Sequence, residues 1–166
     1  MKKLWAVLIL ATLLAGCGAE QTFETVSDLN DVSAMAQMQQ VELSLPEEAA
    51  APSMENPDAG KLYLCDGYTL AVQTLESGDL DKTLRQLTGY GRSQLTLMQT
   101  NRNGIDRYEC VWSAAGEEGD QIGRAVILDD GSYHYSVSVM SAADDAGELA
   151  DTWQKIFDSV KLVSTD

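Results

Sequence analysis

The sequence predicts an α+β domain, in which an antiparallel sheet of about six to seven strands is flanked by two helices. Two observations lead to this fold class. Short runs of alternating apolar and polar residues, separated by turn-forming residues, recur from residue 41 to residue 140. Two other segments, near residues 79–89 and 145–160, carry apolar residues at the three- and four-residue spacing of amphipathic helices.

In the first half of the domain we expect strands at residues 41–45, 61–65 and 68–75. Asp66-Gly67 lies between the last two and is typical of a type I′ hairpin turn, which needs a positive φ at both central residues. Residues 46–60 hold all three prolines of the chain and are predicted to form a loop. Asp79 is placed to cap the helix that follows, and Gly89 to end it.

The second half is expected to be a strand meander that ends in a helix. The strands are predicted at residues 94–100, 107–113, 121–128 and 133–140. In the closing helix, Asp145 and Glu148 have the spacing of a capping box. The apolar stripe of that helix is expected to pack on the sheet and consists of Ala146, Leu149, Ala150, Trp153, Ile156, Phe157 and Val160.

The N-terminus has the features of an export signal. Lys2 and Lys3 precede an apolar stretch over residues 4–14, which is shorter than the roughly 20 apolar residues that span a bilayer. The adjoining Leu14-Ala15-Gly16-Cys17 resembles the lipobox of bacterial lipoprotein precursors. This resemblance implies that residues 1–16 are a signal peptide and that lipid on Cys17 anchors the protein to the cell membrane or the outer membrane, facing outside the cytoplasm. The alternatives are an ordinary signal peptide and a buried N-terminal helix.

The chain is strongly acidic, which limits its partners. It has 11 basic and 26 acidic residues and a net charge of −15, which becomes −17 when residues 1–16, with their two lysines, are removed. A protein of this charge repels phosphate backbones, so we exclude nucleic acid as a partner. Residues 17–40 contain no basic residue and are expected to be a flexible acidic tether to a single globular domain over residues 41–166.

Two cysteines, Cys65 and Cys110, remain once Cys17 is lipidated. Thiols outside the cytoplasm can oxidise, and each of the two lies in a predicted strand, so we expect a disulfide between Cys65 and Cys110. The bond requires their strands to be near neighbours. A strand order that follows the chain would separate them instead, and both would then be small buried apolar residues.

Residue patterns for catalysis are largely missing. His134, the only histidine, shares a predicted strand face with Ser136 and Ser138, which indicates a polar groove, a solvated sheet face or a face under a polar helix edge. Paired aspartates fall at predicted turns or helix starts, where they accept backbone hydrogen bonds; the pairs are Asp79/Asp81, Asp129/Asp130 and Asp144/Asp145. The sequence contains no nucleophile elbow, zinc ligand set, calcium loop or dinucleotide motif, so we expect no cofactor, no metal and no enzyme.

The order of elements resembles the PsbP-like family. The resemblance is carried by Leu43-Ser44-Leu45-Pro46, by the hairpin over residues 63–75 and by the end Trp153–Leu162, and it covers about residues 41–163. It implies an α/β/α sandwich fold and an accessory protein that docks on another protein. The leading hypothesis is therefore a lipid-anchored, non-enzymatic envelope module with a protein partner. The alternatives are a solute-binding lipoprotein of a transport system and a carboxylate-based envelope hydrolase, which a deep pocket lined by His134 and acidic residues would favour.

Overall fold

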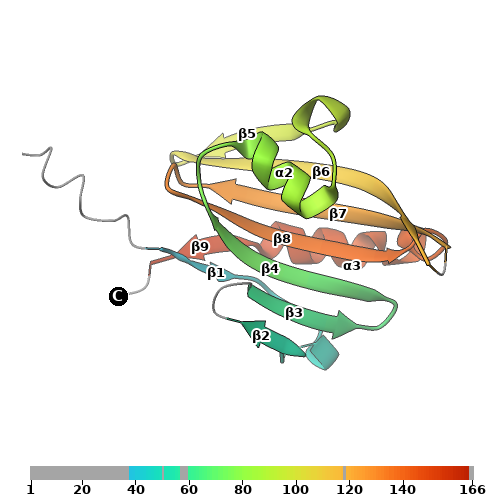
Figure 1. Ribbon diagram of the computed structural model, residues 1–166. Helices are drawn as coiled ribbons and strands as arrows, with labels where there is room; N and C mark the ends of the chain where they lie inside the picture. Colours follow the sequence, from blue (N-terminus) through green and yellow to red (C-terminus); the bar gives the residue numbers. More distant parts are fainter. Residues whose placement is uncertain (1–37, 50, 57–59, 118, 165–166) are drawn as a thin grey trace, which may run out of the picture. The chain divides into compact units, whose positions relative to one another are not determined.

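The computed structural model of the protein describes residues 38–49, 51–56, 60–117 and 119–164. Their main element is a seven-stranded antiparallel sheet with the strand order β2-β3-β4-β8-β7-β6-β5 (Figure 1). Its strands are β2 (Met54–Asn56), β3 (Gly60–Cys65), β4 (Tyr68–Glu76), β5 (Met98–Arg102), β6 (Ile105–Gly116), β7 (Gly119–Asp129) and β8 (Tyr133–Ala142). A separate two-stranded sheet pairs β1 (Gln40–Glu42) with β9 (Lys161–Val163).

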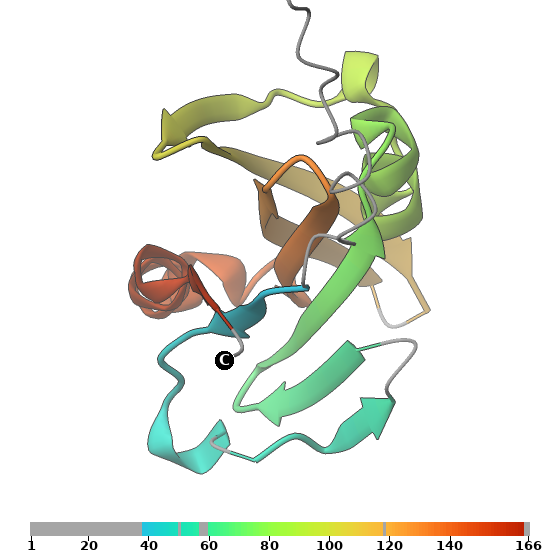
Figure 2. The same cartoon turned by 90° about the vertical axis from the view of Figure 1, so that its left-hand side faces the viewer.

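Two α-helices lie on opposite faces of the seven-stranded sheet, α2 (Leu80–Thr88) on one and α3 (Ala146–Ser159) on the other (Figure 2, green and red). Short 3-10 helices occur at Glu47–Ala49 and Arg92–Gln94. The predicted fold class, an antiparallel sheet flanked by two helices, is confirmed.

The alternation of side chains along the strands divides the core into two layers. The core on the α3 side contains Tyr63, Tyr68, Leu70, Val126, Leu128, Tyr135, Val137, Val139, Trp153, Ile156, Phe157 and Val160. The smaller core on the α2 side contains Leu84, Tyr108, Cys110, Trp112, Ala125 and Ile127. The stripe predicted for the closing helix packs as expected, except for Ala150, which is exposed.

Turn geometry agrees with the sequence in part. Asp66-Gly67 joins β3 to β4, but only Gly67 has a positive φ, so the predicted type I′ turn is wrong there. A type I′ turn is found instead at Asn103-Gly104, where φ is 55° and 81°. Because this turn needs only two residues, β5 continues to Arg102, beyond its predicted end at residue 100.

Helix ends show which capping predictions hold. The Asp79 side chain accepts a hydrogen bond from the Asp81 backbone N–H at 2.9 Å, and Gly89 ends α2 in the left-handed conformation, both as predicted. The capping box at Asp145 and Glu148 is wrong, because Asp145 has helical backbone angles and its side chain makes no capping bond. An N-cap side chain bonds the helix from an extended backbone, which Asp145 does not have.

Two short strands were not predicted. β2 lies within the expected loop over residues 46–60, and β9 follows α3 and pairs with β1. Each has three residues, too few for an alternating pattern to show. β1 covers Gln40–Glu42, so it begins one residue before the strand predicted at residues 41–45 and ends three residues earlier.

Candidate functional site

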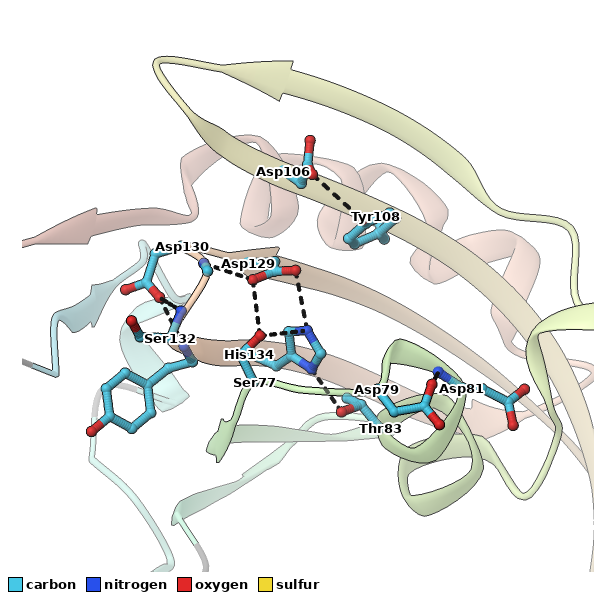
Figure 3. Close-up of polar contacts among 12 residues, drawn as sticks. Ser77, Asp79, Asp81, Thr83, Asp106, Tyr108, Asp129, Asp130, Ser132 and His134 are labelled. Atoms are coloured by element: carbon cyan, nitrogen blue, oxygen red, sulfur yellow. Dashed lines mark hydrogen bonds and ion pairs between the residues drawn. The ribbon is translucent and has the colours of Figure 1, made fainter. Parts of the chain in front are cut away.

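The most polar part of the core is a network around His134, beneath α2 (Figure 3). His134 lies on β8 and is directly opposite Asp129 at the end of β7, because a short hairpin joins these strands. Thr83 comes from the first turns of α2, and Ser77 from the segment between β4 and α2. The backbone N–H of Ser77 donates to the Ser132 carbonyl in the β7–β8 turn at 2.8 Å, which holds these segments together.

His134 is only 1% exposed, and each of its ring nitrogens has a polar partner within the protein. The Nδ1 atom lies 2.7 Å from the Thr83 hydroxyl, and Nε2 lies 3.2 Å from Asp129 Oδ2. The Ser77 hydroxyl is farther away, 3.3 Å from Asp129 Oδ1 and 3.5 Å from Nε2. Because a carboxylate only accepts, Nε2 carries a proton and donates it to Asp129; in the neutral ring Nδ1 then accepts from the Thr83 hydroxyl.

The order carboxylate, imidazole, hydroxyl is that of acyl-transfer triads. A nucleophile of that kind must meet a substrate carbonyl, but Thr83 is only 4% exposed and its hydroxyl points at His134. A depression of about 320 Å³ outside the network is lined by Ser77 and Thr83 but not by His134. The arrangement therefore attaches the start of α2 to the sheet, and the Thr83 hydroxyl is directed at His134 and not at a substrate.

Of the three interpretations of the His134 face, the one under a helix is confirmed. Ser136 is fully buried on the same strand, and its hydroxyl donates to the Gln73 carbonyl at 3.4 Å. Thr83 and Ser77 were not predicted as partners of His134. The one signal in the sequence was the polar face of α2, which carries a threonine one residue before the buried Leu84.

A second polar group lies where the chain enters the domain. The Tyr135 hydroxyl donates to Asp130 Oδ2 at 2.8 Å and accepts from the Gln39 backbone N–H at 3.0 Å. Burial opposes the charge on Asp130, but hydrogen bonds from Ser132, Tyr133, Tyr135 and Gln39 outweigh it, so its pKa lies below the usual value. Burial raises the pKa of Tyr135 to about 12, so this hydroxyl stays protonated and keeps its bond to the carboxylate.

On the α3 side, the half of the sheet formed by β5 and β6 carries a row of six side chains, four exposed and two partly buried, which we call the open strip. The open strip consists of Met98, Thr100 and Arg102 on β5 and Arg107, Glu109 and Val111 on β6. Figure 2 shows the β5–β6 hairpin (yellow) at the top of the sheet, beyond α3. Met98 is 57% exposed and Val111 56%, so two large apolar side chains face solvent here.

Two grooves run along the open strip and share Glu109 in their linings. One, of about 300 Å³, is lined by Met98, Val111 and Arg124 among others. The other, of about 550 Å³, lies between the β5–β6 hairpin and the end of α3 with β9. The grooves therefore join an apolar end of the strip to an end with Arg102, Arg107 and Lys161.

Ion pairs fix the middle of the open strip. Glu109 bonds Arg107 through Oε1 at 3.0 Å and Arg124 through Oε2 at 3.1 Å. Arg107 also donates to the Phe157 carbonyl at 3.0 Å, and Arg124 lies over the Phe157 ring at 4.9 Å. These contacts order the floor of the grooves and tie it to α3. An exposed apolar residue on the face opposite Tyr108 and Trp112, namely Val111, was the signal in the sequence for this surface.

Comparisons with known proteins identify the fold. No protein-family model and no curated protein matches the chain. Among solved structures, LpqN of Mycobacterium tuberculosis, described as involved in cell envelope biogenesis, is 10% identical over 77% of this chain and 86% of its own, with a TM-score of 0.52. Cyanobacterial PsbP (CyanoP) from Synechocystis sp. PCC 6803 is 10% identical over 77% and 95%, with a TM-score of 0.49. A Pseudomonas aeruginosa protein of unknown function is 17% identical over 78% and 87%, with a TM-score of 0.47. The likeness to LpqN shows a shared fold.

The predicted disulfide between Cys65 and Cys110 is wrong, because neither residue forms a disulfide. The strands β4, β8 and β7 lie between β3, which holds Cys65, and β6, which holds Cys110. The two side chains also belong to opposite faces of the sheet. Cys110 is instead a buried apolar residue, and burial raises the pKa of its thiol to about 11.

The predicted lipidation site, Cys17, lies outside the described residues, as do the signal peptide and most of the tether. Within the described part of the chain, no set of three or more histidine, cysteine or acidic residues is placed to hold a metal ion. The helices of that part include none with the length and apolar character needed to cross a membrane.

Proposed function

We propose that this chain is a lipoprotein of the bacterial cell envelope, anchored through lipid on Cys17, whose folded domain is a non-enzymatic accessory module that binds another envelope protein. The lipobox-like Leu14-Ala15-Gly16-Cys17, preceded by two lysines and an apolar stretch, supports the anchor. LpqN, which shares the fold, is described as involved in cell envelope biogenesis, and this supports a role in the envelope for the present chain.

The open strip is the observation that carries the binding role. Met98 and Val111 are each more than half exposed and line one groove, which continues into a second groove with three cationic side chains. Apolar side chains gathered beside fixed charges are typical of surfaces that bind proteins. Ion pairs around Glu109 order the strip before a partner arrives, which reduces the entropy cost of binding.

The two alternative functions have less support. A hydrolase needs an accessible nucleophile or a carboxylate pair in a cleft, whereas the hydroxyl of Thr83 is enclosed beside His134. A solute receptor encloses most of its ligand, whereas the two grooves of the open strip face solvent along an exposed strand.

The anchor is tested by metabolic labelling of the full chain with an alkyne analogue of palmitate, in a bacterium that processes lipoproteins. We expect the label on the unaltered chain in the membrane fraction, and no label on the Cys17→Ser variant. Label on Cys17→Ser, or an unlabelled wild-type chain, would contradict the proposed anchor.

The binding role is tested with a photo-crosslinking amino acid at position 111 of the membrane-held chain. The control places the same amino acid at position 64, because Leu64 on β3 is 60% exposed, close to the value for Val111. We expect crosslinked protein from position 111 only. Equal crosslinking at both positions, or none at position 111, would contradict a binding role for the open strip.

A further inference from the structure

The two edges of the seven-stranded sheet differ in how they are protected. β2, at one edge, has three residues, includes Glu55 and is followed in the sequence by Pro57. Short length, charge and proline are the usual devices that prevent a further strand from pairing. β5, at the other edge, has five exposed residues, no proline and a single charge, at its last residue Arg102. The β5 edge is therefore open to pairing.

The type I′ turn determines which backbone groups face the open edge. In a two-residue hairpin the pair that flanks the turn, here Arg102 and Ile105, exchanges both backbone hydrogen bonds. Pairs along an antiparallel ladder alternate between bonded and non-bonded. Residues 98, 100 and 102 therefore bond to β6, while the N–H and C=O of Gln99 and Asn101 point away from it. These four groups are the ones that an added strand would bond.

The cationic end of the open strip indicates the charge of the added strand. Lys161 Nζ pairs with Glu42 at 2.7 Å, and Arg107 pairs with Glu109 at 3.0 Å. The Arg102 side chain lines the same groove and makes no ion pair or hydrogen bond with any described residue. Arg102 can therefore bind a carboxylate from another chain, with further positive charge close by.

We propose that an extended segment of a partner protein adds to β5 as a further strand. Backbone bonds to Gln99 and Asn101 would hold the segment, a carboxylate would bind Arg102, and a large apolar side chain would lie against Met98 and Val111. Met98 and Arg102 are four residues apart on one face of β5. The apolar residue and the acidic residue of the partner segment are therefore also about four residues apart. This inference rests on the proposed binding function and names its surface and the chemistry of its partner.

A second copy of this chain fits the edge less well. Met98–Arg102 contains no acidic residue, so pairing through the same strand would bring no carboxylate to Arg102. Two copies that each carry a strong net negative charge would also repel each other.

The test uses the full chain, purified from the membrane in detergent, and random peptides of about twelve residues displayed on phage. The Gln99→Pro variant removes the edge N–H without removing a bond to β6, and Gln99→Ala is the matched control that loses the side chain but keeps the N–H. The Arg102→Glu variant reverses the charge without altering the backbone, so it tests the proposal even if Gln99→Pro fails to fold. Urea unfolding of each variant reports on folding.

We expect selected peptides to contain aspartate or glutamate together with a large apolar residue. They should bind Gln99→Ala like the unaltered chain and bind Gln99→Pro about three- to tenfold more weakly, the effect of one lost hydrogen bond. Arg102→Glu should weaken binding by about tenfold, and added salt should reduce that difference. Equal binding to folded Gln99→Pro and Gln99→Ala would overturn the proposal, as would selected peptides without acidic residues.

Two further measurements distinguish strand addition from dimer formation and from binding to the open strip in some other way. Sedimentation of a dimer that Gln99→Pro abolishes would identify the occupant as a second copy and overturn the proposal. Crosslinks from position 111 that form in equal yield in the Gln99→Pro and Gln99→Ala chains would also overturn strand addition, although the proposed binding function would stand. Absence of any crosslink from position 111 in the unaltered chain would instead remove the binding function itself.

Discussion

Replacement of Thr83 by valine tests whether the His134 network holds α2 on the sheet. Valine has nearly the volume of threonine and is also β-branched, so the change removes a hydroxyl and little else. The hydroxyl lies 2.7 Å from Nδ1 of a histidine that is 1% exposed, and the structure shows no other partner for that nitrogen among the described residues. A buried acceptor left without a partner costs about 1–3 kcal/mol, which is the expected loss in the free energy of unfolding.

The matched control is Ser77→Ala. The Ser77 hydroxyl lies 3.3 Å from Asp129 and 3.5 Å from His134, at the long end of hydrogen-bond distances, and the Asp129–His134 contact remains without it. We expect this variant to lose less than about 1 kcal/mol. Thr83→Ser keeps the hydroxyl and should lose only about 0.8 kcal/mol, the value of one buried methyl group.

Urea unfolding of the mature chain, followed by the fluorescence of Trp112 and Trp153, measures these differences. The comparison requires the slope of free energy against urea to stay unchanged, so that a shift in midpoint reports stability alone. If Thr83→Val costs no more than Ser77→Ala, the network does not hold α2 as we describe.

The other predictions concern the core, acid stability and a buried thiol. A Cβ on Gly123 would clash with the Trp112 ring, so Gly123→Ala should lower the free energy of unfolding in urea by about 1–3 kcal/mol. In a chain that already carries Trp112→Leu, the same Gly123→Ala change should cost much less, and additive effects of the two changes would contradict this. Trp153→Ala should cost about 3–5 kcal/mol, and a loss below about 1 kcal/mol would show that α3 is not packed as described. The pKa of Asp130 is lowered in the folded chain, so its contribution is present above the unfolded pKa of about 4 and is lost as pH falls through the native pKa. On acidification, the free energy of unfolding of Asp130→Asn should therefore fall less than that of the unaltered chain. Parallel plots of this free energy against pH for the two proteins would refute this. Because burial raises the pKa of the Cys110 thiol to about 11, iodoacetamide at pH 8 should label Cys110 only after unfolding, and rapid labelling of the native chain would contradict its burial.

The sequence by itself determined the direction of side chains within each segment. Tyr108, Cys110 and Trp112 share a face because successive residues of a strand point to opposite sides, and they do so in the structure. The caps of α2 at Asp79 and Gly89 were also predictable, because each depends only on the backbone within one turn of the helix. Such local patterns also predicted the fold class.

Tertiary structure decided which segments meet. The strand order places β8 between β4 and β7, which separates Cys65 from Cys110 and brings Thr83 and Ser77 to His134. Local alternation is compatible with many strand orders, and the choice among them depends on burial summed over the whole domain. The open strip has the same origin, because α3 contacts β6 at Arg107 but leaves Met98 and Val111 exposed, and no residue within those strands specifies how far a distant helix extends over them.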